Sequence, residues 1–261
     1  MAEGLAATAE GQPGGSLDRL ASLLLLAGLW WAGALLVASP QLFPGPAQVL
    51  GFAWRAIRAG DMPYNMAVML ARVALAFVAA MAVGGVLGGI AGRSRRADRL
   101  IDPWLVVALN LPVLVVVVLC YIWVGLNEVA AILAVAIAKI PTVAVTVREG
   151  ARACDRDLDE LAAVYRLPRG RRLRRILLPQ LAPYLAAAGR SGLSITWKIV
   201  LMVELLGRPN GVGFELNLCF QDFNVTGILA YGLGFAAIML VVEAALLQPW
   251  ERRANAWRRR D

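Results

Sequence analysis

Six long apolar segments dominate this sequence, and they limit the chain to one class of fold. The segments cover residues 20–37, 67–91, 104–124, 129–147, 185–206 and 228–248. A helix rises about 1.5 Å per residue, so a segment of about 20 residues crosses a hydrocarbon layer of roughly 30 Å. Lipid offers no hydrogen-bond partners, so each segment must satisfy its own backbone groups as a helix. We therefore predict an all-α, multi-pass membrane protein with six spanning helices, which excludes a water-soluble enzyme.

The same segments define the domain organisation. Residues 1–19 are rich in Gly, Ala and Glu and are expected to form a flexible tail. Acidic residues dominate this stretch, whereas a signal peptide begins with basic ones, so an uncleaved first span is the better interpretation. Residues 20–250 then form a single transmembrane domain, because the remaining connections are too short for a second folded unit. Residues 251–261 form a basic C-terminal tail.

Basic residues are concentrated on alternate connections between the predicted spans. The chain has 26 Lys and Arg residues against 18 Asp and Glu residues, a net charge of +8. Four arginines lie in residues 92–103, nine in residues 148–184 and five after residue 250. Because basic residues beside spans favour the cytoplasm, we predict that these regions and both termini are cytoplasmic in a bacterial inner membrane. This distribution indicates membrane orientation and not nucleic-acid binding.

The sequence contains no pattern of catalytic or metal-binding residues. It has no histidine and three cysteines, none of them in a C-x-x-C pair, which excludes zinc, haem and a Ser-His-Asp triad. Neither of its two lysines, Lys139 and Lys198, follows a glycine, so no phosphate-binding Walker A loop is present. We therefore predict a non-catalytic protein that binds no cofactor and no metal. If ATP drives its activity, another chain must bind the ATP and Mg.

The connection formed by residues 148–184 is long enough to have a structure of its own. Asp155 and Asp157 are typical of a helix start, and Pro168 and Gly170 are expected to end that helix. The apolar stripe of this helix consists of Leu158, Leu161, Ala162 and Tyr165. A second short helix follows, and prolines 179 and 183 then turn the chain into the fifth span. We expect a helix-turn-helix at the membrane surface, which either binds anionic lipid or docks a cytoplasmic partner.

Several motifs occur in a fixed order over residues 40–258. They are Asn110-Leu111-Pro112, Trp123-Val124-Gly125, Glu160-Leu161-Ala162 with Leu178-Pro179, Glu204, and Gly211-Val212-Gly213. Together they resemble the permeases of ABC importers, in the branch that takes up nitrate, sulfonates and taurine. Residues 160–179 resemble the family's EAA loop, in which Glu-Ala-Ala is followed by a glycine and then by Leu-Pro. Leu161 replaces the first Ala and Arg166 replaces the glycine, so we expect Pro168 and Gly170 to supply the tight turn.

The resemblance implies partners for this chain. It implies a homodimer around a substrate path, a cytoplasmic ATPase subunit that uses ATP and Mg, and an extracytoplasmic solute-binding protein. The residues that it assigns to ATPase coupling are Asp157, Glu160, Leu161, Ala162, Tyr165, Arg166, Leu167, Leu173 and Pro179. It assigns structural roles to Glu204, Gly211 and Gly213.

Charged residues inside the spans suggest a substrate path. Arg190, Ser194 and Lys198 are spaced by four, so they share one helix face that suits a small anion. Packing is the alternative, with Lys198 paired to an acid and Arg190 reaching the membrane surface. Lys139 is expected to line the path or to pair with Glu204.

Glycine and proline positions suggest two further structural features of the spans. Asn110 is expected to mark a bend near Pro112, close to the path. Gly85 and Gly89 form a G-x-x-x-G pair, which either brings two helices close together or reflects the abundance of glycine in membrane helices.

A different class of transporter remains an alternative. An ion-coupled secondary transporter would need no ATPase and would use Lys139, Lys198 and Glu204 as its coupling site. Such carriers commonly have inverted repeats, and the two halves of this sequence show none.

Overall fold

The computed structural model describes residues 16–37 and 39–247, and this part of the chain contains helices and no strands. The helices are α1 (Ser16–Val37), α2 (Pro46–Ala59), α3 (Asp61–Arg93), α4 (Arg95–Asn110), α5 (Val113–Val124), α6 (Glu128–Arg152), α7 (Arg156–Val164), α8 (Arg169–Arg172), α9 (Leu178–Gly207), α10 (Val212–Gln221) and α11 (Val225–Val242). Two π-helical turns, η1 (Leu173–Leu177) and η2 (Glu243–Leu247), continue into α9 and out of α11. The predicted all-α fold is confirmed. Residues 16–19, predicted as tail, belong to α1, and residues 251–261 lie outside the described part.

All six apolar segments are largely helical within the described residues, with the third divided between two helices, but fewer than six are long and apolar enough to be a span. Among the described residues, α3, α6 and residues 225–245 are long and apolar enough to cross a membrane. The pair α4 and α5 makes a fourth span if it is taken as one helix bent by 98°. The apolar part of α1 covers only Leu24–Val37. The prediction of six uniform spans is therefore too simple.

The third predicted span, residues 104–124, is broken at Leu111 and Pro112. Leu111 has the extended backbone angles φ −71° and ψ 128°. Pro112 causes this break, because it lacks an N–H and disfavours a helical residue before it. The predicted bend near Asn110 is thus present, and it divides the segment into two helices.

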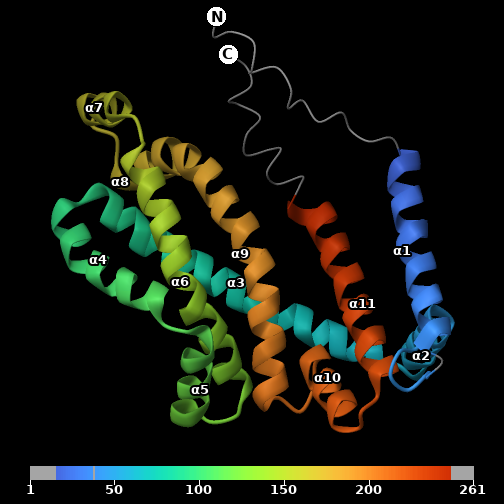
Figure 1. The fold of residues 1–261 in the computed structure, drawn as a ribbon. Coiled ribbons are helices and arrows are strands. Elements are labelled where there is room, and N and C mark those ends of the chain that lie inside the picture. The colour runs from blue at the N-terminus through green and yellow to red at the C-terminus, as the bar shows by residue number, and fades with distance from the viewer. Residues whose placement is uncertain (1–15, 38, 248–261) are drawn as a thin grey trace, which may run out of the picture.

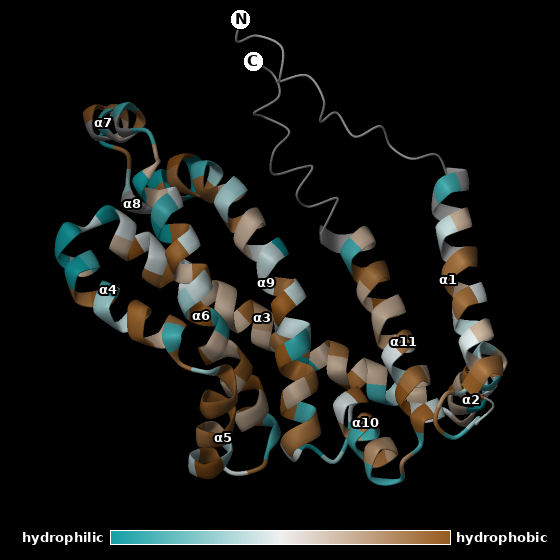
Figure 2. Cartoon of the chain, viewed as in Figure 1, coloured by the Kyte–Doolittle hydropathy of each residue, from teal (hydrophilic) through white to brown (hydrophobic). Residues whose placement is uncertain are grey.

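Helices α3, α6 and α9 form the core of the molecule (Figure 1). Trp197 of α9 is 1% exposed and contacts Phe235 of α11 edge-to-face, with 6.0 Å between ring centroids. Hydrophobic residues run along α5 and α11, whereas hydrophilic ones gather at α7, at α8 and at the start of α4 (Figure 2). We call the end that carries α7 and α8 the α7 end, and the end near α10 the opposite end.

The close contact between α3 and α6 depends on three glycines. A Cβ added to Gly84, Gly88 or Gly92 would lie 2.8, 2.3 or 2.5 Å from the nearest atom of α6. Gly85 and Gly89, the pair that the sequence suggested for close packing, lie one residue away around the helix. A Cβ on Gly89 would meet no atom within 4 Å. The helix contact therefore exists, but in a register shifted by one residue.

Candidate functional site

Helix α7 projects beyond the ends of α6 and α9 (Figure 1). Two hydrogen bonds, each donated by a backbone N–H group to a side-chain oxygen, hold the start of α7 in place. The Asp157 N–H donates to Asp155 Oδ1 at 2.9 Å, and the Asp155 N–H donates to Gln180 Oε1 at 2.8 Å. Gln180 belongs to the first turn of α9, so the position of α7 depends on α9.

The predicted apolar stripe of α7 faces outward for most of its length. Leu161 is 53% exposed and Tyr165 is 71% exposed, and Leu158 and Glu160 are exposed as well. Ala162 is buried and is the one member of the stripe that packs against the chain itself. An apolar face exposed at the end of a membrane protein is a surface that a partner or a lipid headgroup region can cover.

Arg166 forms the turn that ends α7. Its φ is 49°, in the left-handed region that favours glycine. The Leu167 N–H donates to the Ala162 carbonyl at 3.0 Å, which is the bond of a Schellman cap. Gly170 has no positive φ and lies within α8. The expectation that Pro168 and Gly170 make the turn is therefore wrong, because Arg166 itself adopts the conformation of the glycine that it replaces.

The segment after this turn leads into α9 without a break. Helix α9 begins at Leu178, and Pro179 occupies its first turn, where a missing N–H costs little. Pro183 lies inside the helix. The prolines were predicted to turn the chain, and they are instead part of α9. Leu173 and Pro179 are both exposed.

Ion pairs connect α4 to the last turns of α6 at the α7 end. Arg148 contacts Asp102 and also lies 3.4 Å from Asp98. Arg152 contacts Asp98 at 2.5 Å. These contacts join residues 92–103 to the chain that leads directly into α7, so the two basic connections lie at the same end of the molecule.

One face of α9 is charged and open. Arg190, Ser191 and Lys198 are exposed and Ser194 is half-buried, whereas Trp197 and Val200 on the other side are buried. Exposing these cations to lipid would cost free energy, so this face of α9 must contact water or another protein. The structure thus brings Arg190, Ser194 and Lys198 onto one accessible surface.

Lys139 does not lie on that open surface. It is 2% exposed, and its Nζ has no hydrogen-bond partner among the described residues. It fills the space beside Gly192 of α9, where an added Cβ would lie 3.3 Å from Lys139 Cε and 3.5 Å from Phe77. The expected ion pair between Lys139 and Glu204 is absent, because Glu204 pairs with a different residue. Asn110 is exposed and donates to the Val106 carbonyl at 2.8 Å, at the end of α4.

Arg72 organises a polar cluster at the opposite end. Its Nη1 donates to Glu204 Oε1 at 2.7 Å and to the Asn210 carbonyl at 2.9 Å. Its Nε donates to Glu128 Oε2 at 2.8 Å, and Arg208 also contacts Glu128. We call Arg72, Glu128, Glu204, Arg208 and Asn210 the Arg72 cluster. It joins α3, α6 and α9 to the connection that leads into α10.

The position of the Glu204 carboxylate explains why Gly211 and Gly213 are glycines. The Gly213 N–H donates to Glu204 Oε2 at 2.9 Å, so both carboxylate oxygens are occupied. Gly211 has φ 105°, and a Cβ there would lie 2.3 Å from the Glu204 carboxyl carbon. Glycine is required at Gly211 because the carboxylate fills the space of a side chain. The sequence alone did not identify Arg72 as the partner of Glu204. The only indication in the sequence is that Arg72 is the single charged residue in the apolar segment 67–91.

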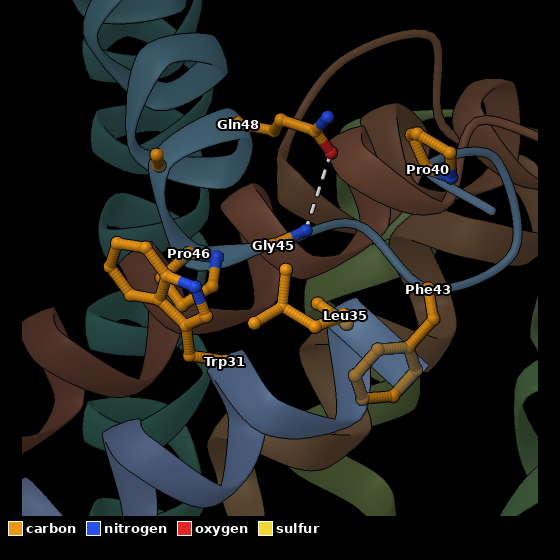
Figure 3. Close-up of a pocket in the computed structure, with 9 residues that line it drawn as sticks. Trp31, Leu35, Pro40, Phe43, Gly45, Pro46 and Gln48 are labelled. Carbon is orange, nitrogen blue, oxygen red and sulfur yellow. Dashed lines mark hydrogen bonds between the residues drawn. The ribbon is translucent and has the colours of Figure 1, made fainter. Parts of the chain in front are cut away.

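An apolar cavity of about 360 Å³ separates α1 from α2 (Figure 3). Trp31, Leu35 and Phe43 line it. Its polar side chain, Gln48, already accepts a hydrogen bond from the Gly45 N–H at 3.3 Å. This cavity offers no charged group for substrate recognition.

The comparisons with known proteins show which class of protein has this fold, with its projecting helix and its charged face. Residues 84–247 match the family described as "Binding-protein-dependent transport system inner membrane component". This match covers more than half of the chain, so the protein belongs to that family of ABC importer permeases.

Several named permeases are similar to this chain over most of its length. It is 27% identical over 226 residues to the putative aliphatic sulfonates transport permease protein SsuC of Bacillus subtilis, covering 87% of this chain and 82% of the relative. It is 26% identical over 244 residues to the taurine transport system permease protein TauC of Escherichia coli, covering 91% and 88%. The fold resembles the inward-facing MetNI methionine ABC transporter, with TM-score 0.59, 18% identity and coverage of 79% of this chain and 97% of that chain.

Proposed function

We propose that this permease moves a small anionic solute, of the sulfonate, taurine or nitrate type, inward across the cytoplasmic membrane. A separate ATPase subunit supplies the energy, since the sequence has no nucleotide-binding loop. The observation that carries the proposal is the exposed α7, a short helix held away from the bundle with its apolar side chains uncovered.

In this proposal α7 docks the ATPase. Leu161 and Tyr165 fill a recess of the partner, and Asp157 and Glu160 surround them with charge. Arg166, Leu167, Leu173 and Pro179 fix the direction of α7 relative to α9. Motion of α7 then reaches the spans through α9 and through the ion pairs of Arg148 and Arg152 with α4.

The open face of α9 is the proposed substrate path. Arg190 and Lys198 supply two positive charges, and Ser194 supplies a hydroxyl between them. Charge-assisted hydrogen bonds to such groups suit a sulfonate or a carboxylate. The names of the sulfonate and taurine relatives are consistent with an anionic group on the solute.

A second copy of the chain completes the path in this proposal. Lys198 and Ser191 on the charged face of α9 are exposed, and a homodimer would enclose this face together with water. The α7 end is cytoplasmic, with both termini, because the basic connections lie there. A solute-binding protein meets the opposite end.

An ion-coupled carrier has less support. Its coupling site required Lys139, Lys198 and Glu204 to act together. Glu204 is bonded to Arg72 and Gly213, Lys139 lies beside Gly192, and Lys198 is on the open face. The three side chains therefore do not form one site.

The docking role is tested by charge substitution on α7. Leu161→Asp should reduce co-purification of the ATPase subunit at least tenfold, because a carboxylate would be buried in an apolar contact. Leu42→Asp is the matched control, since Leu42 is exposed and lies between α1 and α2 at the opposite end. If Leu161→Asp retains the ATPase as well as Leu42→Asp does, α7 is not the docking helix.

A further inference from the structure

A second hollow lies on the outer side of α3, near the α7 end. Its volume is about 700 Å³, and its floor consists of Gly85 and Gly89 of α3. Leu177 of η1 and Leu181 and Leu185 of α9 form the facing wall. A Cβ on Gly89 would meet nothing within 4 Å, and one on Gly85 would meet only Leu185, at 3.8 Å. The hollow thus exists because these two residues lack side chains.

The polarity of this hollow changes along its length. Val86 and Ile90 border its middle and are 61% and 50% exposed. At the α7 end, Arg93 and Ser94 line its mouth. The exposed Arg174 and Arg175 follow Leu173, another residue of the wall. An apolar trough with a cationic mouth matches a ligand that has a long apolar chain and an anionic head.

The membrane location decides what can fill the hollow. Helix α3 is one of the helices that can span, and Arg93 is its last residue, so the mouth lies at the depth of lipid headgroups. A soluble anion would gain nothing from the leucines. One flexible acyl chain can lie along this apolar trough with a charged head at Arg93.

We propose that this groove binds one anionic phospholipid, with an acyl chain between α3 and α9 and its phosphate at Arg93. The site is independent of the solute and of the ATPase. Because its wall includes η1 and the start of α9, the bound lipid lies against the chain that connects α7 to the spans.

The head of the lipid is tested by substitutions at the mouth. The protein is reconstituted in phosphatidylcholine nanodiscs that contain spin-labelled phosphatidylglycerol or spin-labelled phosphatidylcholine, and the immobilised fraction of each is measured. The wild-type protein should prefer phosphatidylglycerol about fivefold, the contribution of one basic side chain at an anionic surface. Arg93→Gln should abolish this preference and Arg93→Lys should retain it. Arg96→Gln is the matched control, since Arg96 is exposed three residues away and does not line the groove.

The acyl chain is tested by filling the trough. Gly89→Leu should lower the immobilised phosphatidylglycerol by about one molecule per chain. Gly232→Leu is its control, because Gly232 lies on α11 and also has open space at its Cβ. Size-exclusion chromatography in detergent verifies that each variant is folded, since a folded variant elutes as a single species. Equal preference in Arg93→Gln and Arg96→Gln, or unchanged binding in Gly89→Leu, would overturn the proposal. Disulfide formation between two copies carrying Val86→Cys would instead assign the groove to a protein contact.

Discussion

At the scale of single residues, Arg166 shows how a substitution can keep the backbone conformation of the residue it replaces. Its φ of 49° and the bond from Leu167 to Ala162 make the turn that a glycine would make. A non-glycine residue in this region costs roughly 1–2 kcal/mol. The sequence suggested that the turn had moved to Gly170, because residue type alone does not reveal that an arginine accepts the strain.

Substitutions of Arg166 test whether the order of α7 depends on the left-handed backbone conformation at this residue or on the arginine side chain. Arg166→Gly should leave α7 as ordered as in the wild-type protein, whereas Arg166→Val should loosen it, because a β-branched residue is worse still at positive φ. Hydrogen–deuterium exchange of residues 156–167 measures this, with about fivefold faster exchange expected for valine. Equal exchange in the two variants would show that the left-handed turn does not order α7.

Glu204 and Glu128 offer a comparison of buried and exposed partners of the same arginine. Glu204→Gln should lower the free energy of unfolding by about 3 kcal/mol, because the new amide places N–H groups against Arg72 or the Gly213 N–H in a dry site. Glu128→Gln should cost less, since the Glu128 side chain is 48% exposed and water can compensate. Thermal unfolding in detergent checks both. A cost as large at Glu128 would contradict the role of burial.

At the scale of elements, the contact between α3 and α6 depends on which side of a glycine-rich helix faces the neighbour. The sequence offers two registers, Gly84-Gly88-Gly92 and Gly85-Gly89, with equal spacing. The structure uses the first for packing and leaves the second open. Periodicity could not choose between them, because the choice depends on how α3 is rotated against a helix more than 50 residues away.

Two alanine substitutions test this register. Gly88→Ala should destabilise the protein by about 1–3 kcal/mol, since its Cβ would lie 2.3 Å from the Ala144 carbonyl oxygen. Gly89→Ala should be neutral or stabilising by about 0.5–1 kcal/mol, because alanine favours helix and meets open space. Thermal unfolding in detergent compares the two. The reverse order would place α6 against the other register.

At the scale of the whole molecule, the sequence predicted the fold class, the family and a helix after Asp155, since each depends on local patterns. The apolar segments predicted the helices, and Asn110 with Pro112 predicted the break in the third. The partners of charged residues could not be predicted in this way. Arg72 and Glu204 are 132 positions apart, and only the folded arrangement of α3 and α9 shows that they meet.

The open face of α9 carries a prediction about transport. Lys198→Gln should reduce uptake of a radiolabelled alkanesulfonate into proteoliposomes about tenfold, the effect of losing one charge-assisted hydrogen bond. Lys198→Arg should retain most of the uptake. Basal ATP hydrolysis by the assembled complex should be unchanged in both, because Lys198 is remote from α7 along α9. Undiminished uptake in Lys198→Gln would remove this residue from the proposed path.

The two sets of ion pairs on α6 have a mechanical consequence. Glu128, its first residue, is bonded to Arg72, and Arg148 and Arg152, in its last two turns, are bonded to α4. Helix α6 therefore cannot slide along its own axis without separating charges. A displacement applied at Arg152, where α6 leads toward α7, would reach Glu128, about 37 Å away at the other end of the helix, with little loss.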